Sequence, residues 1–298
     1  MKARIIVNPN AGSVEGVAAL RESLGRLPGT EICVTDHEGH AEELARQAVE
    51  EGAELVVAAG GDGTLNEVLN GLSSGFGRTR LGLLPLGTGN DFARSIGVPD
   101  DLKAALAILL AGRFQRIDVG RATVGGKSRC FLNMAVGGFS GVVSEKASDA
   151  KERWGPLAYM RGAVDALPEL QAFETTIVLN GAERLRIDTY NVVISNGRYV
   201  AAGIPVAPQA VLDDGLFEVM IAPATTLPKL ALLVPQVLLG QHLNSDLLLF
   251  RRAIRIEIES EPPMAFNVDG EMLGEESSAF EVQPRAVEMV VGPDATES

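Results

Sequence analysis

The sequence has few of the features that disulfide-bonded, secreted or membrane-spanning proteins need. Its two cysteines, Cys33 and Cys130, lie in separate apolar runs, so we expect small buried thiols rather than a disulfide, as suits a reducing cytosol. The N-terminal residues pass directly into a strand-like run without the apolar segment of a signal peptide. The longest apolar stretch, residues 230–240, is interrupted by Pro235 and is too short to cross a bilayer. We therefore expect a cytoplasmic protein.

Positive charge is also scarce. The chain has 26 Lys and Arg against 39 Asp and Glu, which gives a formal net charge of −13 at pH 7. This surplus argues against non-specific nucleic-acid binding and against adhesion to anionic lipid by bulk charge, so any membrane contact needs a local patch. With 298 residues, of which 46% are hydrophobic and 22% charged, the chain has the composition of a globular protein of two domains.

The first part of the chain alternates short apolar runs with segments of helical period. Strands are expected at residues 4–7, 31–35, 54–59 and 81–85, and helices around 17–24 and at 40–51, 64–72 and 101–111. This alternation predicts a doubly wound α/β domain with a mostly parallel sheet over residues 1–118. Ligands bind such sheets beyond the carboxyl ends of the strands.

A glycine-rich turn, Gly60–Thr64 (GGDGT), joins the third strand to the next helix. Thr64 and Glu67 match a capping box, which predicts that Thr64 caps this helix. Such a turn directs free backbone N–H groups and the positive end of the helix dipole into one small space, so it predicts a phosphate site. An ordinary strand-to-helix turn would use the same glycines, and for this motif alone that alternative stays open.

Two more polar, glycine-rich turns are expected at the same edge of the sheet. Residues 8–13 (NPNAGS) follow the first strand, and residues 86–94 (LGTGNDFAR) follow the fourth. Because all three turns follow parallel strands, they would converge, and this convergence favours the phosphate interpretation.

Strand-like runs dominate after residue 118. They are expected at residues 130–136, 175–179, 190–195, 216–221, 254–258, 279–282 and 287–291. We predict a second, β-rich domain over residues 119–285, interrupted by helical insertions at about 142–170 and 226–248. The C-terminal residues 286–298 could complete the first domain.

Three aspartates accompany the phosphate site. Asp62 and Asp91 lie in glycine-rich turns, and Asp118 marks the exit from the first domain. Carboxylates beside a phosphate repel it unless a cation lies between them, and Mg²⁺ suits that role. The alternative for Asp62 and Asp91 is capping of their own turns. By contrast, the spacing of His37 and His40 matches neither HExxH nor a zinc finger, so a solvated loop is favoured over a metal site.

Two acidic pairs lie in the second domain. Asp213 and Asp214 are favoured as part of a plain β-turn, with an oxygen-rich cation site as the alternative. Asp269 or Glu271 could accept the proton of a hydroxyl group in a phosphoryl transfer. From spacing alone, a hairpin turn explains this second pair at least as well.

Together these motifs resemble the catalytic domain of the diacylglycerol kinase family, which includes soluble bacterial diacylglycerol kinases, related lipid kinases and sphingosine kinases. The resemblance covers almost the whole chain and rests on residues 8–9 (NP), 60–67 (GGDGTLNE), 87–91 (GTGND), 196–197 (NG), 204–217 and 269–271 (DGE). GGDGT also occurs in NAD kinases and some phosphofructokinases, but the second motif, residues 85–94, distinguishes this family from them.

The resemblance implies an N-terminal domain akin to phosphofructokinase and NAD kinase, a C-terminal β-sandwich, and ATP between the two. ATP would be bound by Asn8, Asn10, Ala11, Gly12, Thr35, Gly60, Gly61, Asp62, Gly63, Thr64, Leu65, Asn66, Glu67, Gly87, Thr88, Gly89 and Asn90.

The resemblance also implies metal and catalytic roles for the acidic residues. The catalytic Mg²⁺ would be organised through water by Asp62, Asp91 and Asp118. A structural cation would be held by the Val211 and Leu216 carbonyls with the Asp214 carboxylate. Asp269 would be the general base toward the lipid hydroxyl, with Glu271 close by, and the resemblance leaves the division of labour between these two open.

One departure concerns the acceptor. Relatives often have a run of glycines after the Asn-Gly pair, whereas this chain has Ala201-Ala202-Gly203, and the added methyl groups would narrow an acceptor groove. The apolar segments 154–170 and 226–249 are candidates for a lipid-facing wall, and packing against the β-sandwich is an equal alternative.

We therefore predict an ATP- and Mg²⁺-dependent kinase whose substrate is a membrane lipid, with diacylglycerol favoured and phosphatidic acid as the product. It would contact the membrane transiently from the cytoplasm and bind no nucleic acid, and it could form a homodimer. The alternatives are an NAD kinase and a catalytically silent module that binds a nucleotide or a lipid.

Overall fold

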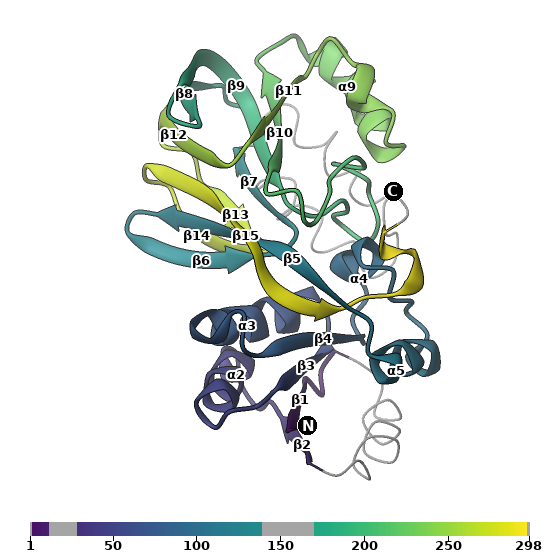
Figure 1. Cartoon of the computed structure of the whole chain (residues 1–298). Helices are drawn as coiled ribbons and strands as arrows, with labels where there is room; N and C mark the ends of the chain where they lie inside the picture. The colour runs from purple at the N-terminus through teal and green to yellow at the C-terminus, as the bar shows by residue number, and fades with distance from the viewer. Residues whose placement is uncertain (1, 12–28, 139–169, 297–298) are drawn as a thin grey trace. The chain divides into compact units, whose positions relative to one another are not determined.

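The computed structural model describes residues 2–11, 29–138 and 170–296. The chain forms two compact units: the first unit contains residues 1–119 and 284–298, and the second contains residues 120–283. Two long strands, β5 (Phe114–Val124) and β15 (Ser278–Val290), pass from one unit to the other (Figure 1). The chain therefore leaves the first unit along β5 and returns to it along β15.

The first unit is built on a parallel sheet with the order β4-β3-β1-β2 (Figure 1). Its strands are β1 (Ala3–Val7), β2 (Thr30–Val34), β3 (Leu55–Gly60) and β4 (Arg80–Pro85). All residues of β1 and β3 are buried, as expected for central strands with both faces covered. In register, Val7 lies opposite both Val34 and Ala59, so three strands end at one level. The predicted α/β sheet is confirmed.

Four helices are described in this unit: α2 (His40–Glu50), α3 (Asp62–Leu72), α4 (Asp91–Ser95) and α5 (Leu102–Ala111). A short 3-10 turn, η1 (Ser73–Gly75), follows α3. Helix α5 has the expected ends, because the Asp101 side chain accepts from the Ala104 N–H and Gly112 adopts the left-handed conformation. The helix expected around residues 17–24 lies outside the described residues.

The predicted capping box is wrong. Helix α3 begins at Asp62, two residues before Thr64, and its N-cap is Gly61 without a side-chain cap. Thr64 is inside the helix, and the Glu67 carboxylate instead accepts from the Ala41 N–H in the first turn of α2 at 3.1 Å. The sequence pattern singled out Glu67 as a capping residue but not the helix that it caps, since the partner lies 26 residues away.

The second unit is an antiparallel sheet assembly with the order β14-β13-β7-β9-β8-β12-β15. The long strand β9 also pairs with β10, β10 pairs with β11, and the β5–β6 hairpin joins at β15. The strand bounds are β6 (Lys127–Phe131), β7 (Met134–Gly138), β8 (Phe173–Leu179), β9 (Glu183–Ser195), β10 (Phe217–Pro223), β11 (Leu249–Ala253), β12 (Arg255–Glu261), β13 (Phe266–Val268) and β14 (Glu271–Gly274). The β-rich second domain is confirmed.

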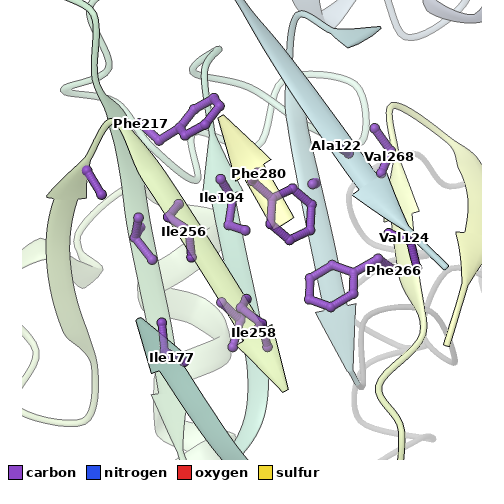
Figure 2. Close-up of a cluster of buried hydrophobic side chains, with 14 of the residues drawn as sticks. Ala122, Val124, Ile177, Ile194, Phe217, Ile256, Ile258, Phe266, Val268 and Phe280 are labelled. Atoms are coloured by element: carbon purple, nitrogen blue, oxygen red, sulfur yellow. The ribbon is translucent and has the colours of Figure 1, made fainter. Parts of the chain in front are cut away.

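Apolar side chains from the inner faces of these strands form one core (Figure 2). Phe266 and Phe280 meet at its centre with ring centroids 4.9 Å apart, and Ile194 and Ile256 lie beside them. The core carries these side chains on alternate positions of each strand, as expected for packed β-layers. It gives the turns at the strand ends a rigid support.

Several expected elements of the second unit differ in extent. Residues 130–136 form two strands, because the chain breaks at Leu132 and Asn133 between β6 and β7. Residues 279–282 and 287–291 belong to the single strand β15, apart from Val291. The insertion at 226–248 contains helix α9 (Leu227–Leu238) and the 3-10 turn η3 (His242–Asn244). The insertion at 142–170 lies outside the described residues up to residue 169.

Helix α9 is apolar apart from Lys229, Pro228, Pro235 and Gln236, but it has only 12 residues. Among residues 2–11, 29–138 and 170–296, no helix is both long and apolar enough to span a membrane. The chain ends in a 3-10 turn, η4 (Pro293–Thr296), which follows β15 in the first unit.

Candidate functional site

The two glycine-rich turns after β3 and β4 are in backbone contact. The Leu86 N–H donates to the Gly60 carbonyl at 2.9 Å. A Cβ atom added to Gly87 would lie 2.6 Å from the Gly61 Cα, so the close approach requires glycine at this position. The sequence pattern placed these turns at one sheet edge, and the structure joins them.

The start of α3 is suited to an anion. Its N-cap residue Gly61 is extended, and no side chain caps this N-terminus among the described residues. The first N–H groups of a helix have no partner within the helix, and they carry the positive end of its dipole. Because Gly61 and Gly63 have no side chains, a phosphate group can approach these N–H groups closely.

Asp62 and Asp91 are brought together at the second turn. The Asp62 carboxylate accepts from the Asp91 N–H at 3.1 Å and from the Phe92 N–H at 3.2 Å, so it caps α4. A Cβ atom at Gly89 would lie 3.0 Å from Asp62 Oδ2 and 3.7 Å from Asp91 Oδ2. Asp62 therefore does not cap its own turn, as the alternative had it, but caps the helix α4 that follows the second turn.

These two carboxylates also fit a hydrated Mg²⁺. Each carboxylate oxygen has two lone pairs, so an oxygen that accepts one N–H bond can still accept from a metal-bound water. Two carboxylates beside a phosphate site are the oxygen donors that Mg²⁺ commonly uses. Arg94 lies 3.7 Å from Asp91 Oδ1 and limits the excess negative charge.

Asn90 holds the second turn in shape. It adopts a left-handed conformation, with φ of 50°. Its side-chain amide accepts from the Gly87 N–H at 3.1 Å and donates to the Gly87 carbonyl at 2.7 Å. Asn90 is buried, and its side chain stabilises the conformation of the turn.

Asn8 links the first turn to the glycine-rich helix. Its side-chain amide donates to Thr64 Oγ1 at 3.1 Å, and its carbonyl oxygen Oδ1 accepts from the Asn10 N–H at 3.0 Å. The buried residue Thr35 follows β2, and its N–H donates to the Val7 carbonyl. These contacts place Asn8, Thr35 and Thr64 at the end of neighbouring strands.

The other residues that are expected to bind ATP differ in how accessible they are to a ligand. Leu65 and Asn66 are buried in α3 with 2% of their surfaces exposed, so Leu65 can offer a ligand only its backbone. Ala11 forms a backbone hydrogen bond with Asn8. Gly12 lies outside the described residues.

Asp118 has a different setting on β5. It is fully buried, and its carboxylate accepts from the Arg285 N–H at 2.7 Å. Arg285 has a positive φ of 49°, so this bond holds an unusual bend of β15. The bond between Asp118 and the Arg285 N–H is thus structural, and the expected role of Asp118 toward Mg²⁺ stays a prediction.

In the second unit, the loop that is expected to bind a structural cation contacts the positively charged side chain of Arg252. Asp214 accepts from the Leu216 N–H at 3.0 Å and from the Arg252 guanidinium, and Arg252 also pairs with Glu218 at 2.8 Å. A divalent cation at Val211, Asp214 and Leu216 would share the carboxylate with a guanidinium of like charge, which fits poorly. We derive no metal role for this loop.

Asp269 occupies the turn between β13 and β14 with φ of 46°. Its carboxylate accepts from the N–H groups of Leu132 at 2.8 Å, Asn133 at 3.1 Å and Met134 at 2.9 Å. Both oxygens are engaged, and together they hold the break between β6 and β7. A carboxylate held in this way is well suited to position a loop.

Glu271 begins β14 and is more accessible. Its carboxylate pairs with Arg129 at 2.6 Å, and 45% of its side chain is exposed. The bond to Arg129 fixes one oxygen, while the exposure leaves the group open to a ligand. The structure therefore distinguishes two carboxylates that spacing could not separate.

Sequence reasoning missed Asn133 near this turn, and it noted Asn196 only as part of a motif without giving it a role. Both are buried, and the Asn196 side chain donates to the Leu132 carbonyl at 2.9 Å. The Asn133 carbonyl accepts from the N–H groups of Asn196 and Gly197. A polar residue inside the apolar run 130–136 was the available signal, because a buried amide needs partners.

Two protein-family models together match most of the chain. Residues 2–122 match the diacylglycerol kinase catalytic domain, and residues 133–291 match the YegS C-terminal NAD kinase beta sandwich-like domain. Proteins named diacylglycerol kinase from Staphylococcus aureus strains RF122 and MRSA252 are 32% identical over 284 residues, covering 94% of this chain and 89% of theirs.

Solved structures are similar over the full length. A protein from Bacillus anthracis str. Sterne that is assigned as a diacylglycerol kinase has 25% sequence identity and a TM-score of 0.81, with 98% of each chain covered. A second structure of this description has 26% identity and a TM-score of 0.80.

Proposed function

Because this chain belongs to the diacylglycerol kinase family of lipid kinases, we propose that it transfers the γ-phosphoryl group of ATP to the hydroxyl of diacylglycerol to give phosphatidic acid. The observation that carries the proposal is the backbone contact between the two glycine turns, which sets Asp62 and Asp91 beside an uncapped helix N-terminus. That arrangement suits a triphosphate with its counter-ion.

In this proposal the first unit holds the nucleotide. The N–H groups at the start of α3 would bind phosphate oxygens, and Asn8 and Thr64 would border them. Asp62 and Asp91 would hold hydrated Mg²⁺. The chemistry that Mg²⁺ supplies when bound is neutralisation of charge on the transferring phosphate group.

The second unit supplies the carboxylates for the acceptor. We assign Glu271 as the group that receives the hydroxyl proton while the oxygen forms its bond to phosphorus and the bond to ADP breaks. Its exposure, together with an ion pair to Arg129 that engages only one of its oxygens, favours this assignment. Asp269 acts as a positioning residue, since its oxygens already hold three backbone N–H groups.

The proposed substrate belongs to a membrane, and α9 is the described candidate for contact with it. Leu232 and Leu239 are each 67% exposed, and Lys229 is the single charged residue of the helix. Contact through one apolar helix would be transient, and it would allow a protein of net charge −13 to approach a bilayer from the cytoplasm. The candidate wall at 154–170 lies outside the described residues up to residue 169.

The test of the reaction is phosphoryl transfer from radiolabelled ATP to diacylglycerol, ceramide-type alcohols and sphingosine in mixed micelles, with NAD as a soluble acceptor. Labelled phosphatidic acid that requires Mg²⁺ is the expected product. Label on NAD alone would contradict the proposal in favour of an NAD kinase. ATP binding without label on any acceptor would contradict it in favour of a silent binding module.

The test of membrane contact is flotation with vesicles that contain diacylglycerol. Leu232→Gln is expected to weaken flotation, because it removes exposed apolar surface from α9. Leu110→Gln is the matched control, since Leu110 is 61% exposed on α5 of the first unit. Equal flotation of wild type and Leu232→Gln would contradict a role for α9.

A further inference from the structure

A cluster of metal-ligating side chains lies in the loop after β2, apart from the aspartates described above. Asp36, His37 and His40 each offer one ligand atom, and the three atoms lie within 4.8 Å of one another. The Nδ1 atom of His40 is 2.7 Å from Asp36 Oδ1, and His37 Nδ1 contacts the same oxygen. The two imidazole rings stack with centroids 4.6 Å apart. Two imidazoles and one carboxylate therefore converge on one point.

The contacts of His40 conflict with each other when no cation is present. Its Nδ1 atom lies 3.2 Å from the Asp36 N–H, which needs an acceptor, and 2.7 Å from the Asp36 carboxylate, which needs a donor. A neutral imidazole nitrogen is either a donor or an acceptor. One of the two contacts is thus unfavourable in either tautomer. An ion bound by both the nitrogen and the carboxylate would replace the contact between these two atoms once they move apart from 2.7 Å.

The charge of the loop favours a cation. Asp36 supplies one carboxylate, which contacts both imidazoles. Glu43 adds a second carboxylate, 3.9 Å from the Nε2 atom of His37. Asp36 and His37 have side chains that are 75% and 54% exposed, so an ion can enter and the ligands can adjust around it.

We propose that Asp36, His37 and His40 bind one divalent transition-metal ion of the zinc class. Imidazole nitrogen with one carboxylate is a common donor set for Zn²⁺, and three protein ligands leave a fourth position for water. Mg²⁺ prefers oxygen donors and would not compete well here. The chain would thus have two metal sites of different selectivity. Asp62 and Asp91 offer oxygen donors, whereas this loop also offers nitrogen donors.

The sequence spacing argued against a metal site because it matches no familiar zinc motif. The structure changes that assessment, because the turn from β2 into α2 folds Asp36 back onto His40. The third ligand is the aspartate next to His37, which a search for paired histidines does not include. This site is independent of the proposed kinase reaction.

The test is titration of the full chain, without a polyhistidine tag, with Zn²⁺ in excess Mg²⁺ by isothermal calorimetry. One Zn²⁺ per chain is expected. His37→Ala and His40→Ala are each expected to weaken binding by about tenfold or more, because each removes one of three ligands. Glu38→Gln is the matched control, since Glu38 is an exposed residue of the same loop, and it should bind like wild type.

The chain has three histidines, so imidazole NMR signals give an independent measurement. Zn²⁺ should shift the signals of His37 and His40 and leave those of His242, which is buried against the Val206 carbonyl in the second unit. Absence of stoichiometric Zn²⁺ binding would overturn the proposal. Equal binding by wild type and a His37→Ala/His40→Ala double variant, or shifts confined to His242, would also overturn it.

Discussion

The two units place carboxylates in contrasting ways. In the first unit, Asp62 and Asp91 belong to short glycine turns at the ends of adjacent parallel strands, so the sheet order brings together two motifs only 29 residues apart. In the second unit, Asp269 is held by N–H groups of residues 132–134, more than 130 residues away along the chain. Motifs therefore identify the first kind of site well, whereas the second kind becomes clear only when distant strands are paired.

Replacement of Asp62 tests the first unit and should have the largest effect. Asp62→Ala is expected to lower kcat at least about 100-fold, because it removes a proposed Mg²⁺ donor beside the phosphate groups. It should also cost about 1 kcal/mol of stability, because α4 loses its cap. Steady-state kinetics and thermal unfolding measure the two effects.

Asp101→Ala is the matched control for this loss of stability. Asp101 caps α5 of the same unit through the Ala104 N–H at 2.9 Å. The control should lose a similar amount of stability and keep its kcat. A folded Asp62→Ala protein with normal activity would remove the metal assignment.

Substitutions of the two carboxylates of the second unit, Glu271 and Asp269, should have different effects on kcat and on stability. Glu271→Gln is expected to lower kcat by about 10²- to 10⁴-fold with little change in stability, as for loss of a general base. Asp269→Asn should instead destabilise the protein by about 1–3 kcal/mol, because an amide nitrogen cannot accept from the buried N–H groups. Glu275→Gln is the control, since Glu275 is exposed on the same hairpin. Full activity of Glu271→Gln would return the base assignment to Asp269.

The contact between the glycine turns can be broken by one methyl group. Gly87→Ala would place a Cβ atom 2.6 Å from the Gly61 Cα, which requires backbone movement and is expected to cost about 1–3 kcal/mol. Gly63→Ala is the control for stability, because no atom lies within 4 Å of its added Cβ. Thermal unfolding compares the two, and equal stability would show that the turns are not packed as described.

The smallest effect is expected at Arg252. Arg252→Ala removes the positive charge between Asp214 and Glu218 and should lower the free energy of unfolding by about 1 kcal/mol, since the side chain is 47% exposed. In thermal unfolding without nucleotide, a His37→Ala/His40→Ala background should be insensitive to a chelator, whereas the same background with Arg252→Ala should be stabilised by added divalent cations. Strong destabilisation of the His37→Ala/His40→Ala protein by the chelator would restore the structural cation that the family resemblance implies.

The sequence predicted most of the fold of the first unit, because strand–turn–helix segments are local. It failed at Glu67, whose partner is the Ala41 N–H of another helix, and at Asp62, which caps α4. In both cases the pattern has the correct residue type, and the partner depends on how helices pack on the sheet.

In the second unit the sequence predicted β-structure but not its connections. The apolar run 130–136 contains a strand break that its composition does not indicate. The break occurs because Leu132 and Asn133 direct their N–H groups to Asp269 instead of a neighbouring strand. The sequence also did not indicate that Arg252 reaches Asp214 from β11. Such pairings depend on strand register, which the sequence did not specify.

The central claim is that the first unit binds the nucleotide and the second unit acts on the acceptor. The most direct test is to measure MgATP affinity by calorimetry and transfer to diacylglycerol for one variant, Glu271→Gln. We predict MgATP affinity equal to that of wild type, together with loss of transfer. Normal transfer, or loss of nucleotide binding in step with transfer in a folded protein, would contradict this division of roles.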